Sequence, residues 1–281
     1  MTYPHRAPAD PAPQVTSSVS KITGQKDWAP RSERRPLRAM PLARRYEVAF
    51  QRPEGGVGTV SRLAPALPLF EQAFSAVARG TVIATPNGPT AVEDLMPGDL
   101  VTTLENGPEE LLWTGTITLY PVTTTERTGG HAGEPARLTR IMADSYGLGR
   151  PLTDVVLGPH ARVLRRDPRL PSLVGAEQAY APVRAMADGE SVIEVTPATP
   201  VSVHHLVLAQ QRTLSAAGVD IESFHPGEGF EGMMDRQLLQ LFLALFPHLP
   251  QGDERQRLRG FGPVAHPRLT RFEAEELQLA R

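Results

Sequence analysis

The sequence of 281 residues contains no cysteine, which excludes disulfide bonds, thiolate metal sites and catalysis by a thiol nucleophile. Lysine is scarce as well, because only Lys21 and Lys26 occur, and asparagine is limited to Asn87 and Asn106. The formal net charge is −2, so the chain lacks the basic excess with which proteins bind nucleic acid. We therefore expect no nucleic-acid partner.

Long apolar runs are also missing. A membrane helix needs about 20 apolar residues, and the longest candidate, residues 238–246, is about half that length and includes Gln240. The N-terminal residues lack the apolar core of a secretion signal and contain four prolines within the first 13 positions. We expect no membrane association and a cytoplasmic location, with export by a route without such a signal as the open alternative.

Proline and glycine are abundant, with 28 and 24 residues, which favours short strands and many turns over long helices. Residues 1–45 are rich in proline, serine, threonine and arginine, and their few apolar side chains cannot offset the entropy lost on ordering. We expect a disordered tail there; the alternative is that the arginine-rich residues 31–45 dock an acidic partner. Residues 46–74 form a lead-in, with a strand expected at 46–50, and residues 63–78 are expected to form a short helix that leads into the domain.

The most informative stretch is residues 75–103, which read SAVARGTVIATPNGPTAVEDLMPGDLVTT. Residues 81–85 and 90–92 predict a β-hairpin, because Asn87-Gly88 between them accepts the positive φ angles of a tight turn. The turn that follows leads into a further strand at 100–103.

This stretch closely resembles the opening of the Hint (Hedgehog/intein) domain in its bacterial form. There, a cysteine is followed after three residues by Gly-Thr-x-Ile-x-Thr-Pro-x-Gly and later by Val-Glu-Asp-Leu-x-Pro-Gly-Asp. The resemblance continues through Trp113-Thr-Gly115, residues 155–164, His205-Leu206 and residues 222–227, and covers about half of the chain. It implies an all-β fold, with a Hint-like β-disc of short strands over residues 75–227 and a small helical C-terminal extension over residues 228–281.

The resemblance assigns a nucleophile that this chain does not have. In an active Hint domain the first cysteine attacks the preceding carbonyl carbon and converts a peptide bond into a thioester. Alignment on Gly80 places this nucleophile at Ala76. The nearest hydroxyl group, on Ser75, is one residue out of register, and such a shift in an extended segment turns the side chain to the opposite face.

The positions assigned to acid chemistry are replaced too. The histidine that protonates the departing nitrogen falls on Ala161, with His160 one residue early. A second histidine near the end of the domain, counted from His205, falls on Gln211. Release in the manner of an intein also needs a terminal asparagine, and both asparagines of the chain lie in early turns.

Periodicity predicts further elements in the second half. Residues 191–196 and 201–208 alternate on either side of a proline-containing turn and predict a hairpin. Residues 231–246 carry apolar side chains at helical spacing, and Thr270 with Glu273 has the spacing of a capping box, so two helices are expected in the extension.

The histidines His160, His204, His205 and His225 form the cluster that could hold a metal ion or act as acid and base. Adjacent strand residues face opposite sides, so His204 and His205 cannot both bind one ion, and zinc needs three or four convergent ligands. We expect no metal and no cofactor, and we interpret His205 as a buried, hydrogen-bonded side chain.

Two functions are consistent with these residues. The missing nucleophile, acid and asparagine favour a Hint-like domain that is inactive in autoprocessing and acts as a structural or protein-binding module with an unidentified protein partner, because catalytic groups act as a unit. The alternative is a residual self-cleaving, autoproteolytic enzyme that uses Ser75 with His160 or His205.

Overall fold

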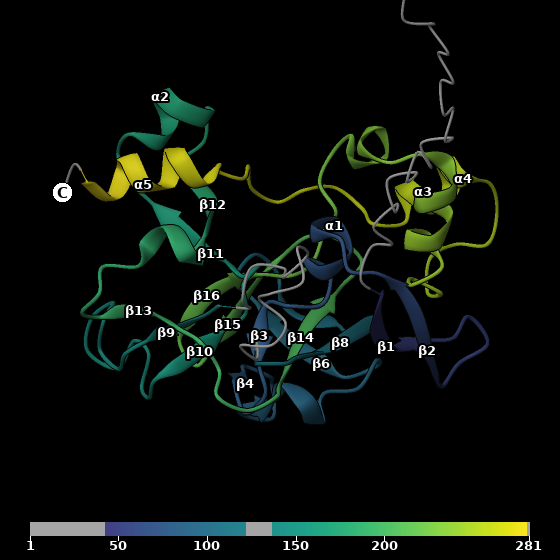
Figure 1. The fold of residues 1–281 in the computed structure, drawn as a ribbon, viewed down its shortest axis with the longest axis horizontal. Helices are drawn as coiled ribbons and strands as arrows, with labels where there is room; N and C mark the ends of the chain where they lie inside the picture. Colours follow the sequence, from purple (N-terminus) through teal and green to yellow (C-terminus); the bar gives the residue numbers. More distant parts are fainter. Residues whose placement is uncertain (1–42, 122–136, 280–281) are drawn as a thin grey trace, which may run out of the picture. The chain divides into compact units, whose positions relative to one another are not determined.

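The computed structural model describes residues 43–121 and 137–279. Their regular structure is mainly strand, arranged in two antiparallel sheets with a few short helices, which confirms the predicted all-β class (Figure 1). The predicted tail lies outside the described residues up to position 42, and its residues 43–45 are part of the first strand, β1 (Ala43–Gln51).

The first sheet includes part of the lead-in. A hairpin of two nine-residue strands is joined to the rest of the sheet by the pairing of its first strand, in which Val48 lies opposite Gly115. The strand order is β13 (Val192–Val195), β9 (Leu138–Ile141), β10 (Val155–Leu157), β3 (Val77–Ala78), β14 (Val201–Val207), β8 (Trp113–Leu119), β1 and β2 (Val57–Pro65).

The second sheet contains the hairpin predicted around Asn87-Gly88. Gly88 has a φ angle of 108°, which glycine adopts without the steric cost that other residues meet, so the chain reverses here. The strand order is β12 (Gln178–Pro182), β11 (Arg162–Arg166), β16 (Val219–Glu222), β15 (Thr213–Ala216), β4 (Val82–Ile83) and β5 (Thr90–Ala91), and β6 (Leu100–Thr103) pairs with both β15 and β7 (Gly107–Glu110).

The helices are short, and three of the five described α-helices lie in the C-terminal extension. Two of these three start with side-chain caps: Asp235 accepts a hydrogen bond from the backbone N–H of Leu238 at 2.8 Å, and Asp253 with Gln256 forms a capping box. The α-helices are α1 (Pro68–Glu71), α2 (Leu170–Val174), α3 (Arg236–Leu243), α4 (Glu254–Arg259) and α5 (Arg271–Leu279), and the 3-10 helices are η1 (Val92–Asp94), η3 (Val183–Met186) and η4 (Phe230–Met233).

Two predictions for the extension are close to the structure. Thr270 and Glu273 do cap α5, because the Thr270 backbone N–H and hydroxyl both donate to Glu273 Oε2, at 2.7 and 2.8 Å. The helix predicted over residues 231–246 is shorter than expected, since η4 and a break precede α3.

Two other predictions are wrong. The helix expected over the whole of residues 63–78 is limited to the four residues of α1, because β2 continues through Pro65 in its pairing with β1 and β3 begins at Val77. The hairpin expected from residues 191–196 and 201–208 does not form: β13 pairs with β9, and β14 lies between β3 and β8. Each strand finds a partner distant in sequence, which local alternation cannot indicate.

An aromatic cluster attaches the C-terminal extension to the first sheet. The ring of Trp113, fully buried, lies 5.1 Å from that of Phe74 and 4.9 Å from that of Phe246, measured between centroids. The indole N–H of Trp113 donates to the carbonyl oxygen of Leu245 at 2.8 Å, so its one polar atom is satisfied. Residues after 228 are therefore packed into the same folded unit as the strands.

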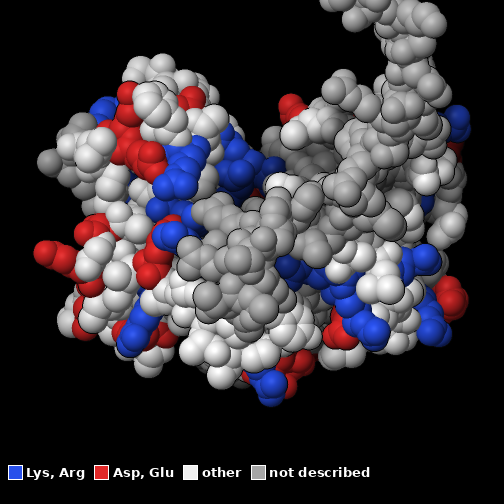
Figure 2. Space-filling view, viewed as in Figure 1, with Lys and Arg blue, Asp and Glu red and all other residues white. Residues whose placement is uncertain are grey.

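The surface mixes charges of both signs. Figure 2 shows arginine and acidic side chains interspersed over the face in view, as the near-zero net charge leads one to expect. Among the helices of residues 43–121 and 137–279, none has the length and apolar character needed to cross a membrane. The cytoplasmic location stays a prediction.

Candidate functional site

The two positions aligned with the missing nucleophile and acid lie in the core. Ala76 immediately precedes β3 and Ala161 immediately precedes β11, and both are buried in the same apolar cluster, with 2% and 1% of their surface exposed. The backbone N–H of Ala76 donates to the carbonyl oxygen of His204 in β14 at 2.9 Å, and its carbonyl oxygen accepts from Gly158 N–H at 2.8 Å. Sheet pairing therefore fixes the backbone at position 76.

The Ser75–Ala76 peptide bond, which aligns with the bond that an active domain would attack, is closely surrounded. The Ser75 carbonyl oxygen accepts a hydrogen bond from the backbone N–H of His160 at 3.2 Å. Gly158 passes so near that a Cβ atom added to it would lie 2.2 Å from that same oxygen. Only glycine fits at position 158 without displacement of the Ser75–Ala76 peptide.

Gly158→Ala is expected to lower the free energy of unfolding by about 1–3 kcal/mol, because the new methyl group must push backbone atoms apart. Urea unfolding followed by tryptophan fluorescence would measure this. Gly232→Ala is the matched control, since a Cβ there meets no atom within 4 Å, and it should change stability by no more than about 0.5 kcal/mol. Equal stabilities of the two variants would contradict the close approach.

The structure brings together two of the fallback candidates, Ser75 and His160. The hydroxyl oxygen of Ser75, which is fully buried, lies 2.9 Å from His160 Nδ1 and 2.7 Å from the carbonyl oxygen of Glu71, at the end of α1. A hydroxyl group has one proton, and a carbonyl oxygen can only accept. When Ser75 donates to Glu71, His160 Nδ1 must therefore carry a proton and donate to Ser75, and it cannot then act as a base.

The electrostatic surroundings keep His160 neutral. Burial, together with the positive charges of Arg162, Arg184 and Arg44, lowers the pKa of His160 to about 4. A general base works best with a pKa near the working pH, so at neutral pH this imidazole is a weak base towards the Ser75 hydroxyl.

His205, the third fallback candidate, is buried among apolar groups. Its Nδ1 accepts a hydrogen bond from the backbone N–H of Leu206 at 3.1 Å, and its ring meets Phe224 edge-on at 5.4 Å. Burial is the largest cause that lowers its pKa to about 3, and the charges of Arg268 and His160 lower it further. The interpretation of His205 as a buried, hydrogen-bonded side chain agrees with this environment.

The side chains of the other two histidines of the predicted cluster make hydrogen-bond contacts with residues other than Ser75. The ring of His204 faces β8, where its Nδ1 lies 2.9 Å from Thr116 Oγ1. His225 contacts the C-terminal extension, because its Nε2 lies 3.0 Å from the carbonyl oxygen of Gly262. Within residues 43–121 and 137–279, histidine, aspartate and glutamate side chains do not gather in any group of three or more that could hold a metal ion.

Gln211, at the position of the second family histidine, anchors the C-terminal segment. Gln211 is fully buried; its side-chain oxygen accepts from the backbone N–H groups of Ala265 and His266, at 2.7 and 3.4 Å, and its amide nitrogen donates to Glu222 Oε1. Arg268 from the same segment donates to Glu222 Oε1 at 2.7 Å. An amide thus performs a structural task at a position where the family often carries a histidine.

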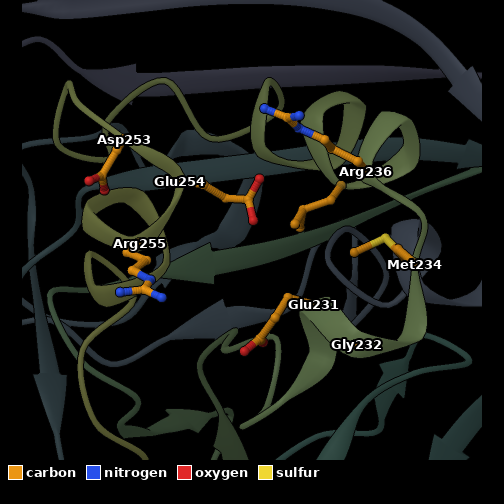
Figure 3. Close-up of a pocket in the computed structure, with 8 residues that line it drawn as sticks. Glu231, Gly232, Met234, Arg236, Asp253, Glu254 and Arg255 are labelled. Carbon is orange, nitrogen blue, oxygen red and sulfur yellow. The ribbon is translucent and has the colours of Figure 1, made fainter.

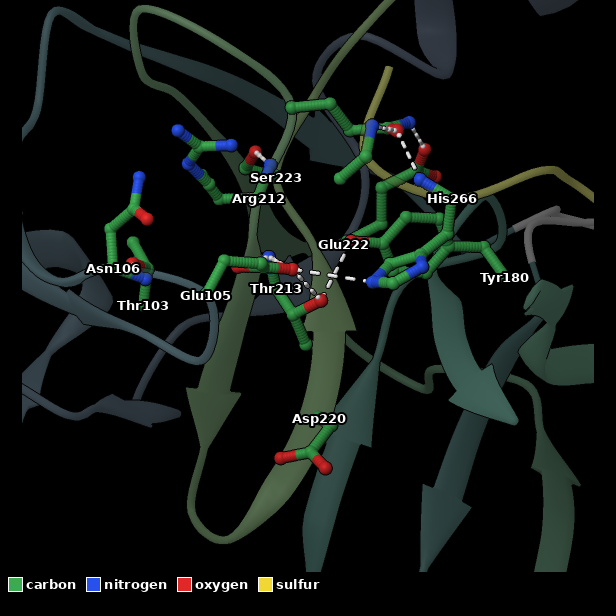
Figure 4. Close-up of polar contacts among 12 residues, drawn as sticks. Thr103, Glu105, Asn106, Tyr180, Arg212, Thr213, Asp220, Glu222, Ser223 and His266 are labelled. Carbon is green, nitrogen blue, oxygen red and sulfur yellow. Dashed lines mark hydrogen bonds and ion pairs between the residues drawn. The ribbon is translucent and has the colours of Figure 1, made fainter. Parts of the chain in front are cut away.

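A second polar group lies beside it. The Glu105 carboxylate accepts from the Thr213 hydroxyl at 2.7 Å and lies 3.4 Å from His266 Nε2, while the Tyr180 hydroxyl is 2.8 Å from that of Thr213 (Figure 4). Local sequence patterns do not indicate either group, because Glu105 and Thr213 are 108 residues apart, Glu222 and Arg268 are 46 apart, and no motif joins them.

A cavity of about 650 Å³ lies between η4, α3 and α4 (Figure 3). Its charged lining combines both signs: three acidic residues, Glu231, Asp253 and Glu254, and two arginines, Arg236 and Arg255. All of its lining residues lie between positions 231 and 255, so it includes none of the candidate catalytic positions.

Comparison with known proteins identifies the family. A family model described as the Hint domain matches residues 75–228, which is more than half of the chain. The chain belongs to the Hint domain family. Among solved structures it is similar to one titled "Solution Structure of Bacterial Intein-Like domain from Clostridium thermocellum", with 14% sequence identity and a TM-score of 0.34 over 53% of this chain and 99% of that one. No curated protein matches the chain.

That this Hint domain departs from the family pattern at the positions that carry the chemistry stays a prediction from the sequence. The three residues concerned, Ala76, Ala161 and Gln211, are all packed in the interior. The Ser75–His160 pair is an arrangement that the family positions do not predict. The division of the chain at residues 45, 74 and 227 stays a prediction.

Proposed function

We propose that this Hint domain protein is inactive in autoprocessing and acts as a structural or protein-binding module for an unidentified protein partner. The Ser75–Ala76 peptide carries the proposal. The side chain of Ala76 has no lone pair with which to attack the carbonyl carbon of Ser75. Ala161 has no proton to give to the nitrogen of this peptide. Hydrogen bonds from His160 N–H and to His204 C=O hold both sides of this peptide in the sheet.

The C-terminal segment supports the same conclusion. A domain that releases the segment C-terminal to it must let that segment dissociate once the peptide bond between them is broken. Here Gln211, Glu222 and His225 hold residues 262–268 by hydrogen bonds and an ion pair, and Trp113 packs against Phe246. The extension acts as part of the module.

The intact mass of the purified full-length chain tests the proposal. We expect the mass to stay at 30.6 kDa after prolonged incubation at neutral pH. Ala76→Cys alone should give little or no thioester that hydroxylamine can cleave, because no acid assists the leaving nitrogen, whereas Ala76→Cys with Ala161→His is expected to give some. Spontaneous cleavage of the unmodified chain next to position 75 or 76 would overturn the proposal.

The Ser75–His160 contact favours one alternative, residual self-cleavage. In that reaction Ser75 Oγ attacks the carbonyl carbon of Phe74, the C–N bond breaks, and the nitrogen of Ser75 takes up the proton that the hydroxyl lost. The resulting ester is opened by water, which leaves fragments 1–74 and 75–281. The hydrogen bond from Ser75 to Glu71 competes with this reaction, because it directs the hydroxyl proton away from His160.

Two variants separate the alternative from the proposal. If cleavage occurred and was lost in both Ser75→Ala and His160→Gln, the protein would be an autoproteolytic enzyme of this displaced type. Cleavage that persisted in both variants would point to a contaminating protease, and no cleavage in any of the three chains is the expected result.

A further inference from the structure

A pocket of about 170 Å³ lies between the loop of residues 146–150, β11 and the turn that joins β15 to β16. Apolar side chains line its interior: Val163, Met186 and Val219 are each at most 3% exposed, and Tyr146 adds an aromatic ring. An apolar cavity of about 150 Å³ is enough to hold one benzene molecule. The pocket therefore has room for a single six-membered ring.

The charged side chains of the same pocket are unbalanced. Among the described lining residues, Arg150 and Arg166 share one carboxylate, that of Asp220, so two positive charges face one negative charge there. Arg150 and Arg166 both approach the same oxygen, Asp220 Oδ2, at 3.3 and 3.6 Å. These distances exceed the 2.7–2.9 Å or so of a strong charged hydrogen bond, so the two guanidinium groups share one weakly held anion.

A carboxylate close to β11 in the sequence is bound by an arginine that does not line the pocket. Asp167 follows β11, and Arg169 binds it with two nitrogens, both at 2.8 Å. Arg169 holds the pKa of Asp167 well below its usual range, with a smaller contribution from Arg165. Asp167 is thus committed to Arg169, and it is not part of the pocket lining.

We propose that this pocket binds a carboxylate attached to a ring-sized apolar group. The ring packs on Val163, Met186 and Val219, and the carboxylate lies at the mouth between Arg150 and Arg166, whose side chains are each about half exposed and accessible from solvent. This site is separate from residues 75, 76, 160 and 161 and does not depend on the proposed function. The carboxylate comes either from a free aromatic acid or from the C-terminus of a peptide that ends in an aromatic residue.

Ligand-observed NMR and calorimetry with the full-length chain test the proposal, with benzoate as the probe. Benzyl alcohol has nearly the same shape without the charge and should bind at least about tenfold more weakly, because it cannot form charged hydrogen bonds. A tripeptide that ends in phenylalanine, compared in its free-acid and amidated forms, tests the peptide source. Binding of the free acid alone would support a chain terminus, and binding of benzoate but neither peptide would support a free acid.

Substitutions locate the binding site. Arg150→Gln and Arg166→Gln should each weaken benzoate binding by about threefold to tenfold, whereas Asp220→Asn should strengthen it, because the ligand then no longer competes with the resident carboxylate. Arg140→Gln is the matched control: Arg140 is similarly exposed, pairs with Asp154 on the other sheet, and should leave binding unchanged. Thermal unfolding of each variant would confirm that it is folded.

The arginine variants are expected to weaken benzoate binding and Asp220→Asn to strengthen it. A general loss of structure would weaken binding in all of these variants, so it can be distinguished from the proposed effect. Equal binding of benzoate and benzyl alcohol, no binding of either, or equal effects of Arg140→Gln and Arg166→Gln would overturn the proposal.

Discussion

Between pH 8 and pH 5 the protein is expected to lose several kcal/mol of its free energy of unfolding, because four histidines are buried in their neutral form. Burial is the largest cause in each case. It lowers the pKa of His160 and His204 to about 4, and that of His205 and His248 to about 3. In the unfolded chain, histidine has a pKa of about 6.5.

The direction follows from proton binding. Below pH 6.5 the unfolded chain takes up protons that the folded chain does not accept, so acid favours unfolding. The loss of stability from each histidine continues until its folded pKa, about 4 for His160 and His204 and about 3 for His205 and His248, is reached. Each such histidine contributes up to about 1.4 kcal/mol per pH unit in this range. Urea unfolding at a series of pH values would measure the effect, and a midpoint that did not change between pH 8 and pH 5 would contradict it.

His248 offers the sharpest single test of this dependence. Its ring lies beside Trp113 and Phe246, and neither of its nitrogens has a hydrogen-bond partner among the described residues. His248→Phe keeps the aromatic contact and removes the titrating group, so at pH 5 the variant should be more stable than the unmodified chain by about 1–2 kcal/mol. At pH 8 the imidazole is neutral in both the folded and the unfolded chain, so the difference in stability between the variant and the unmodified chain should be smaller. An equal difference at both pH values would show that protonation of His248 is not the cause.

Arg268→Met is expected to lower the free energy of unfolding by about 3–5 kcal/mol, the usual cost of leaving a buried charge without its partner. Glu222 is only 4% exposed, and its charge is compensated by Arg268 Nε at 2.7 Å and, more distantly, by Arg162 Nε at 3.7 Å. Burial raises the pKa of Glu222 in spite of these partners. Loss of Arg268 also removes its hydrogen bond to the carbonyl oxygen of His225.

Two controls separate charge from general damage. The double variant Glu222→Gln, Arg268→Met should be more stable than Arg268→Met alone, because no uncompensated charge stays buried. Arg271→Met removes one partner of the exposed pair with Glu275 on α5 and should cost at most about 1 kcal/mol. If Arg268→Met and Arg271→Met were equally stable, the buried ion pair would have no special part in holding the extension.

Local sequence patterns predicted the elements whose partners are near in sequence. The β4–β5 hairpin follows from Asn87-Gly88, and the cap of α5 follows from the three-residue spacing of Thr270 and Glu273. The pairing of β13 with β9 did not follow, because its partner lies some fifty residues earlier and an alternating pattern is compatible with any antiparallel neighbour. For the same reason the sequence did not predict that Arg268 would neutralise Glu222, 46 residues away.

At the candidate site the sequence by itself determined which groups are present: the order of the Hint motifs and the alanines at positions 76 and 161. Only the tertiary structure decided what the displaced residues do. Ser75 and His160 each lie one residue from the position that the motif assigns, and the motif alone does not indicate that their side chains are in contact. In the fold, the segment before β3 that carries Ser75 lies against the turn before β11 that carries His160, and the two side chains meet at 2.9 Å. A contact between segments 85 residues apart depends on how these segments approach each other in space, and neither segment encodes it separately.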